Sequence, residues 1–230
     1  MSHNLRLRLI ILLIGLSPLM VITLGYLVYD PFYVLKSYQN YSNSRVILDR
    51  DYVSTQSFID RYQSHQYDSF IFGSSRTVAF RPEKWKDYLD KENHVFLFDA
   101  SSETIYGIHL KIKYLDKLGI DIKNALIVLC RDGSFGQDKN SIQHLSIKHP
   151  ALTGESRMAF HMVFFRAYLN PMFLASYYTY KYTGNYYKWM NEYIELRNVS
   201  YDPVTNQMEL PDIEESIDKD PESYYRSMAK

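Results

Sequence analysis

The sequence predicts an α/β protein made of an N-terminal transmembrane helix, a partial doubly wound parallel sheet and a helical C-terminal part. Three observations lead to this fold class. Residues 9–29 carry no charge, strand-like and helix-like segments alternate over residues 67–132, and the alternation stops after Gly136. We expect four parts: a cytoplasmic tail over residues 1–8, an anchor over 9–29, a stalk over 30–66 and an α/β domain over 67–230.

The uncharged stretch has the length of a membrane-spanning helix, since about 20 apolar residues cross the hydrocarbon core. Arg6 and Arg8 precede it and Asp30 follows it. The positive-inside rule therefore predicts a single-pass protein of the cell membrane, with a cytoplasmic N-terminus and an extracytoplasmic main domain. Two alternatives stay open. One is a cleaved signal peptide, whose apolar run is shorter, and the other is a buried core helix, which rarely lacks charge for so long.

Composition excludes several functions. The chain has 26 basic and 26 acidic residues and no basic stripe, which gives no electrostatic case for nucleic acid. Cys130 is the single cysteine, so no disulfide forms within the chain. Scattered histidines without Cys-x-x-Cys or His-x-x-x-His spacing predict no metal site, and we expect no cofactor.

Three segments read as strands: Ser69–Phe72, His94–Phe98 and Ala125–Leu129. The last is a continuous apolar run, which favours a parallel strand buried on both faces. Helices are expected over residues 54–64, within the stalk, and over 82–89 and 103–118 between the strands. Ser101 or Ser102 is predicted to cap the last of these helices, and Gly119 to end it.

Polar residues follow each predicted strand, at Gly73–Ser75, Asp99–Ser102 and Arg131–Asp132. Ligands of doubly wound sheets bind outside the carboxyl ends of the strands. We therefore expect these three turns to converge on one edge of the sheet and to form the site.

The C-terminal part begins with an apolar segment over residues 157–175. His161, Arg166 and Pro171 argue against a second membrane span, which leaves an amphipathic helix packed on the domain or lying at the membrane interface. Tyrosines then crowd residues 176–198, either as packing surface or as a carbohydrate-stacking platform. A loop or short hairpin is expected over residues 202–212, and a charged helix over 214–230.

Gly73-Ser74-Ser75, placed after a strand and behind an anchor, resembles the first block of the SGNH (GDSL-like) hydrolase superfamily. The resemblance is to its membrane-anchored, extracytoplasmic branch, which includes D-alanyl-transfer and alginate O-acetylation proteins, and it covers residues 67–132 in usable detail. It implies a flavodoxin-like sheet and makes Ser75 the nucleophile. A serine on a strand-to-helix turn exposes its hydroxyl, and its backbone N–H can enter an oxyanion hole. The alternative is a turn serine that only caps the next helix.

The resemblance has three departures around this turn. Ser74 stands where the family has an aspartate. Ser102, in Ala100-Ser101-Ser102, stands near the glycine whose N–H binds the oxyanion, so Ser75 and Ser102 are the oxyanion candidates. Asp132 stands where the family has an asparagine, and an ionised carboxylate donates no hydrogen bond, so its role is open.

The largest departure is the missing Asp-x-x-His, in which histidine is the base and aspartate orients it. No histidine of this sequence has an acidic residue three positions earlier. Later strands are not evident after Asp132 either. We expect the α/β domain to be incomplete at its C-terminus, and the alternative is a diverged, inactive relative.

The remaining reactive side chains have simple interpretations. His109 and His161 are the first candidates for a substitute base, although each is expected to pack or to contact solvent. His144 and His149 form a metal pair only if acidic or thiol ligands join them. Cys130, at the end of a strand, is predicted to be a small core residue and not a reactive thiol.

The functional prediction is acyl-ester chemistry on a cell-envelope polysaccharide, with Ser75 forming an acyl-enzyme if a histidine completes the site. As it stands, the chain is expected to be inactive. An alternative is a non-catalytic binding or assembly module that partners a membrane-bound acyltransferase. A further alternative is an anion-binding turn at Gly73–Arg76.

Overall fold

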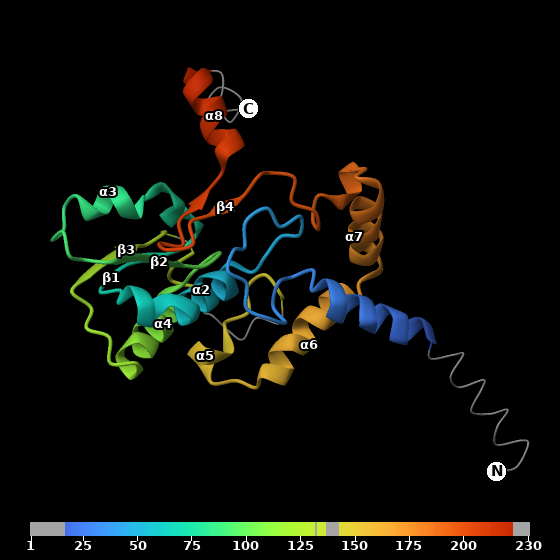
Figure 1. Ribbon diagram of the computed structural model, residues 1–230, viewed down its shortest axis with the longest axis horizontal. Helices are drawn as coiled ribbons and strands as arrows, with labels where there is room; N and C mark the ends of the chain where they lie inside the picture. The colour runs from blue at the N-terminus through green and yellow to red at the C-terminus, as the bar shows by residue number, and fades with distance from the viewer. Residues whose placement is uncertain (1–16, 132, 137–142, 223–230) are drawn as a thin grey trace, which may run out of the picture.

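The computed structural model describes residues 17–131, 133–136 and 143–222 and shows an α/β fold with helices on both faces of a parallel sheet (Figure 1). The strands are β1 (Ser69–Gly73), β2 (Val95–Asp99) and β3 (Asn124–Val128), in the order β2-β1-β3. Both pairings are parallel and run in register from Ser69 to Gly73. The predicted α/β class and parallel sheet are confirmed.

The strand order puts the two connecting helices on opposite faces. β1 is central, so α3 (Pro82–Lys86) leads to β2 on one side, and α4 (Ile105–Lys117) must cross β1 to reach β3 on the other. Right-handed crossovers in opposite directions place their helices on opposite faces. Accordingly, Trp85 of α3 packs with Ile71 on one face, while α4 packs on the phenylalanines of the other, Phe70, Phe72, Phe96 and Phe98.

α2 (Arg50–His65) shares the phenylalanine face with α4 and buries Phe58 completely against it. The helix starts earlier than the sequence predicts, because the Asp49 side chain accepts a hydrogen bond from the Asp51 N–H and caps it. Residues 50–65, expected within a stalk, thus pack directly on the sheet.

The predicted cap of α4 is wrong. The cap is Thr104, whose hydroxyl accepts from the Gly107 N–H at 3.3 Å. Neither Ser101 nor Ser102 fills this role, because the chain turns once more before the helix begins. Glu103 is consequently directed into the core, where it is fully buried beside two lysines.

β3 is not buried on both faces, contrary to the prediction. Its residues alternate between half-buried and exposed, and Ile127 and Leu129 are 46% and 49% exposed. The exposed positions alternate along the chain, so they lie on one face of β3, which is left uncovered. β3 is also an edge strand, since no strand in the described ranges pairs with its outer side. The outer edge of β2 is covered instead: the Leu97 N–H donates to the Thr205 carbonyl at 2.8 Å, and the Asn206 amide donates to the Leu97 carbonyl at 2.7 Å.

An N-terminal helix covers residues 17–29 and ends at the buried Asp30. Within the part of the chain that the structure describes, no helix combines the length and the apolar character needed to cross a membrane. The predicted span over residues 9–29 lies partly outside that range. The transmembrane part of the predicted fold therefore gains no support here.

The C-terminal half is mainly helical and contains one hairpin, and it makes a second core with the N-terminal helix. The apolar segment predicted as one helix divides into α6 (Arg157–Tyr168) and α7 (Pro171–Thr183), because Asn170 caps α7 and Pro171 starts it. The expected hairpin is present as β4 (Ser200–Tyr201) and β5 (Met208–Glu209). Short elements complete this half: α5 (Pro150–Thr153), η2 (Lys188–Met190) and α8 (Pro211–Lys219). The end of the predicted charged helix lies outside the described residues.

Candidate functional site

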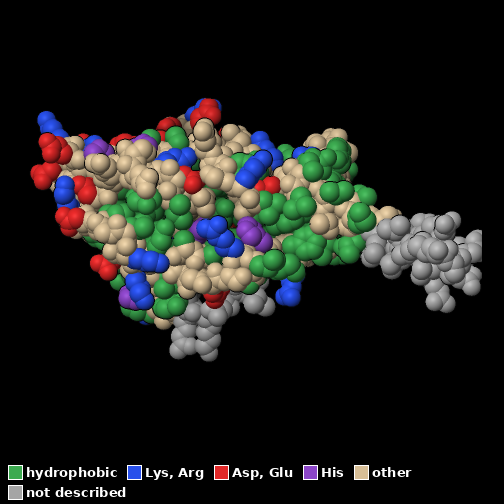
Figure 2. Space-filling model, turned by 60° about the horizontal axis from the view of Figure 1, so that its bottom comes forward, with side chains coloured by type: hydrophobic (Ala, Val, Ile, Leu, Met, Phe, Trp, Pro, Cys, Tyr) green, Lys and Arg blue, Asp and Glu red, His purple; other side chains and the backbone are tan. Residues whose placement is uncertain are grey.

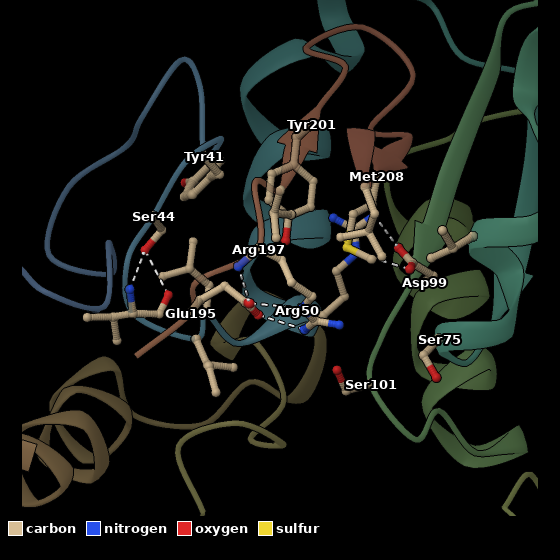
Figure 3. Close-up of a pocket in the computed structure, with 16 residues that line it drawn as sticks. Tyr41, Ser44, Arg50, Ser75, Asp99, Ser101, Glu195, Arg197, Tyr201 and Met208 are labelled. Carbon is tan, nitrogen blue, oxygen red and sulfur yellow. Dashed lines mark hydrogen bonds and ion pairs between the residues drawn. The ribbon is translucent and has the colours of Figure 1, made fainter. Parts of the chain in front are cut away.

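A cavity of about 240 Å³ lies at the carboxyl ends of β1 and β2 (Figure 3). Four parts of the chain line it: residues 41–50, the turn after β1, the turn after β2, and residues 195–210. Most lining side chains are apolar, including Val46, Leu48, Val78 and Met208. Two of the three predicted turns therefore meet at one cavity, as expected for the carboxyl edge of a parallel sheet.

Gly73 makes the turn after β1 possible. Its φ is 151°, and a Cβ there would come within 2.6 Å of the Val128 carbonyl oxygen on the neighbouring strand. Only glycine fits this backbone. The chain then turns Ser74 inward, where its hydroxyl lies 3.0 Å from the Cys130 sulfur, and leaves Ser75 outward.

Ser75 is exposed, lines the cavity and begins the short helix η1 (Ser75–Ala79). Its hydroxyl is thus accessible to a bound molecule, as a nucleophile requires. Ser101 lines the cavity too, whereas Ser102 is exposed and is not among the described lining residues. Ser102 has φ 52°, in the left-handed region that favours glycine, which is the residue the family resemblance places here. Asp132 lies outside the described residues.

A buried ion pair forms one wall of the cavity. The Arg50 guanidinium contacts both Asp99 oxygens, at 2.7 Å through Nη2 and 3.0 Å through Nε, and also donates to the Asn206 carbonyl at 2.8 Å. Burial alone would lower the pKa of Arg50, but Asp99 outweighs this and raises it. The arginine is fully committed to the protein and holds α2, β2 and the β4–β5 turn together.

A second, more exposed pair lies at the cavity border. Arg197 donates from Nε and Nη2 to the two Glu195 oxygens, at 2.9 and 2.6 Å. Burial favours a higher pKa for Glu195, but hydrogen bonds from Arg197 keep it below its ordinary value. Both arginines of the cavity are therefore neutralised by a carboxylate, and Arg76 is not among the described lining residues. An apolar or ester-bearing ligand fits this wall better than a phosphate-like anion does.

No histidine is found among the described residues that line the cavity. His109 is exposed on α4, and His161 is half-buried beside Phe160 on α6. Burial lowers the pKa of His161, and it also lowers that of His144, which packs on Phe32 and Phe164. The described lining therefore offers Ser75 no imidazole base.

His149 has a structural place. Its Nδ1 accepts from the Ala151 N–H and caps α5, and burial lowers its pKa to about 4. Within the described ranges, no group of three or more histidine, cysteine, aspartate or glutamate side chains is arranged to hold a metal ion.

A buried charged cluster lies behind the cavity, and sequence reasoning missed it. Lys111, fully buried, contacts Glu103 at 2.5 Å and Asp51 at 3.4 Å, and it donates to the Asp99 carbonyl at 2.9 Å. Lys148 contacts the same two carboxylates, at 2.5 and 3.3 Å. Through the Asp99 backbone, this cluster fixes the end of β2 that carries the cavity wall.

The sequence contains one signal for this cluster. Glu103, Gly107 and Lys111 recur every four residues, which places them on one helix face, and that face also carries Ile108 and Leu115. The glycine between them is required by the packing, because a Cβ on Gly107 would overlap Glu103 Oε1 and come within 2.7 Å of Lys148 Nζ. Arg50 gave no such signal, since its partners lie far away in the sequence.

Comparison with known proteins adds no relative. No protein-family model, no curated protein and no solved structure matches this chain.

Proposed function

We propose that this chain is a membrane-anchored, SGNH-like protein of the cell envelope whose cavity binds the acyl ester of an envelope glycan. The observation that carries the proposal is the position of Ser75, exposed at the carboxyl end of β1 and bordering a largely apolar cavity. A volume of about 240 Å³ suits a short acyl group and part of a sugar. The hydroxyls of Ser75 and Ser101 supply the polar contacts that would orient the ester.

The same cavity binds the ester but does not hydrolyse it. Attack by a serine hydroxyl requires a base to take its proton, and the described lining offers no histidine. Asp99, the buried carboxylate nearest the cavity, is already paired with Arg50. The chain therefore acts as an ester-binding module, and complete catalysis requires a base from elsewhere.

A second candidate function, an assembly module for a membrane-bound acyltransferase, is favoured by the outer edge of β3. No described strand pairs with this edge, and Ile127 and Leu129 are exposed on one face of the same strand segment. An uncovered strand edge is a template for another polypeptide. Both candidates place the domain in the envelope, and they differ in whether a glycan or a protein is bound.

Binding of an acyl ester is tested with one oligosaccharide in two forms. The full chain in detergent is heated with an O-acetylated N-acetylglucosamine oligosaccharide, and with the same sugar after removal of its O-acetyl ester. We expect the midpoint of thermal unfolding to rise only with the ester. Val78→Trp, which fills the cavity, should abolish the rise, whereas Val204→Trp on the exposed β4–β5 turn should keep it. An equal rise with both sugars contradicts ester binding.

The membrane orientation is tested separately. The uncharged residues 9–29 follow Arg6 and Arg8, so the domain should lie outside the cytoplasm. Protease added to intact spheroplasts should digest residues after Asp30. Protection of the domain until the membrane is permeabilised would show that the orientation is reversed.

A further inference from the structure

A broad apolar surface lies on the outer sides of the N-terminal helix, α6 and the start of α7 (Figure 2). Its most exposed side chains are Met158 at 75%, Val28 at 70% and Val21 at 68%. Leu24 and Leu27 extend it along the N-terminal helix, and Met162 and Met172 extend it over α6 and α7. Apolar surface that gathers in this way on a folded protein marks an interaction site.

The chain that builds this surface carries no negative charge. Residues 156–191 contain no aspartate or glutamate, and their charged residues are all basic: Arg157, Arg166, Lys181 and Lys188. Exposed methionines with basic neighbours suit the boundary between acyl chains and anionic headgroups. Long basic side chains bury their stems and keep the charge in the headgroup layer.

The N-terminal helix is fixed against α6 and α7. Tyr26 is buried, with its ring centroid 5.3 Å from Phe165 and 5.1 Å from Tyr168. Gly25 allows this approach, since a Cβ there would come within 2.8 Å of the Tyr168 hydroxyl oxygen of α6 and still closer to the Tyr178 hydroxyl oxygen of α7. The outer side of this helix is therefore continuous with the outer sides of α6 and α7, and all three meet the same surroundings.

From these contacts we infer that the outer sides of the N-terminal helix, α6 and the start of α7 form one surface that contacts the outer leaflet of a lipid bilayer, with the N-terminal helix entering the acyl chains and α6 and the start of α7 lying at the headgroup boundary. The inference rests on the proposed anchor, because the uncharged sequence continues from this helix back to Leu9. It goes further by placing α6 and α7 in the lipid as well. Exposed Tyr182, which shares a hydrogen bond of 2.9 Å with Tyr29, fits the aromatic belt of such an interface.

A lipid bilayer fits this surface better than a second copy of the chain. A protein contact between two copies would bring the basic residues of α6 and α7 together without acidic partners, because this segment has none. A bilayer containing anionic lipid offers both the apolar phase and the opposite charge. It also continues directly from the segment proposed as the anchor.

The test uses a fluorophore that reports its surroundings. In a Cys130→Ala background, single cysteines replace Met158, Met172 and, as control, Tyr88, which is 86% exposed next to α3. Each full chain is labelled with a nitrobenzoxadiazole dye and reconstituted into phosphatidylcholine–phosphatidylglycerol vesicles. We expect a blue shift at Met158→Cys and Met172→Cys, and severalfold stronger quenching there by lipids with a nitroxide near the headgroup. Tyr88→Cys should keep the emission of a label in water.

The outcomes separate this surface from the anchor. If the chain stays in the vesicles while both methionine labels emit as in water, the surface does not contact lipid and the anchor stands. If the chain does not enter vesicles at all, both ideas are overturned. A blue shift without lipid quenching, together with disulfide cross-linking of unlabelled Met158→Cys chains after addition of an oxidant, would show that a second copy covers the surface and would overturn the lipid assignment.

Discussion

The two cores of this protein solve the burial of polar groups in opposite ways. The core between α2, α4 and the sheet buries full charges and pairs them, with Lys111 enclosed by Glu103 and Asp51. The core between the N-terminal helix, α6 and α7 contains phenylalanine and tyrosine, and pairs tyrosine hydroxyls, as between Tyr168 and Tyr178 at 2.6 Å. Both cores contain many aromatic rings; we call the first the ionic core, because it also buries ion pairs, and the second the aromatic core, because tyrosine hydroxyls pair there instead.

The difference extends to the outer surfaces. Over the ionic core the surface carries charged and polar side chains, such as Lys113 and Asp116 on α4. Over the aromatic core it carries Met158, Val21 and Val28. The apolar exterior over the aromatic core is the feature from which we infer contact with lipid. The surface over the ionic core has no such feature.

The ionic core should respond most strongly to the loss of one charge. Lys111→Met leaves Glu103 and Asp51 buried with Lys148 as their remaining cation, and we expect the free energy of unfolding to fall by about 3–5 kcal/mol. Urea denaturation measures this. Lys113→Met, on the exposed side of the same helix, should change it by less than about 0.5 kcal/mol. Equal losses for the two variants would contradict a charge-dependent core.

The aromatic core should respond to lost volume instead. Phe164 is fully buried, with its ring centroid 5.0 Å from Phe160 and 5.6 Å from Phe32. Phe164→Ala is expected to lower the free energy of unfolding by about 3 kcal/mol through the cavity it leaves, at every pH tested above about 7, where His144 beside it is uncharged. Phe135→Ala, at an exposed phenylalanine, is the control. A loss for Phe164→Ala that varies with pH in this range would break the comparison with the ionic core.

A smaller effect is expected at Asp49, the cap of α2. Burial and the Asp51 carboxylate raise its pKa well above the ordinary carboxyl range, and its Oδ2 has no hydrogen-bond partner among the residues that the structure describes. A raised pKa means that Asp49 favours folding when protonated and loses that contribution as pH rises toward the folded-state value. Asp49→Asn keeps the acceptor oxygen of the cap without the charge. It should therefore be more stable than the parent near neutral pH and equal to it in acid.

The measurement for Asp49→Asn is the free energy of unfolding across the acid-to-neutral range. The contribution of Asp51 to the free energy of unfolding should have the opposite pH dependence. Burial alone would raise its pKa, but Lys111 and Lys148 outweigh burial and lower it, so its contribution is lost as pH falls. Asp116→Asn, exposed on α4, should follow the parent at every pH. A gain for Asp49→Asn that persists unchanged in acid would contradict a protonatable cap.

The smallest effect is expected at Ser75. Ser75→Ala should change the free energy of unfolding by less than about 0.5 kcal/mol, because the side chain is exposed. General-base help supplies about 10²–10⁴-fold in rate, so without it the parent should hydrolyse p-nitrophenyl acetate no faster than Ser75→Ala. A fluorophosphonate probe should label both poorly. Strong labelling of the parent at Ser75 would reveal a base, and His109 and His161 are the first to replace.

The sheet could be predicted from local sequence signals. The walls of the site could not, because contacts between residues far apart in the sequence form them. Apolar runs ended by Gly73 and Asp99 located β1 and β2 to within one residue. Burial of β3 was predicted wrongly, because an apolar run does not say whether other elements cover both faces of the strand. Arg50 was missed, since its partners Asp99 and Asn206 lie 49 and 156 residues away.

The contacts of Asn206 also set an order of events during folding. Its carbonyl accepts a hydrogen bond from Arg50, and its side chain donates one to Leu97, so Asn206 joins the start of α2 to the middle of β2. Asn206 itself lies 156 residues after Arg50, which is more than half of the sequence. Such non-local closure is slow, because a long loop loses its entropy before the contact forms. During synthesis the sheet and α4 are complete while residue 206 is still inside the ribosome. The nascent protein therefore passes through a stage in which the edge of β2 is uncovered and the cavity lacks the wall formed by residues 195–210. This is the stage that a chaperone would bind.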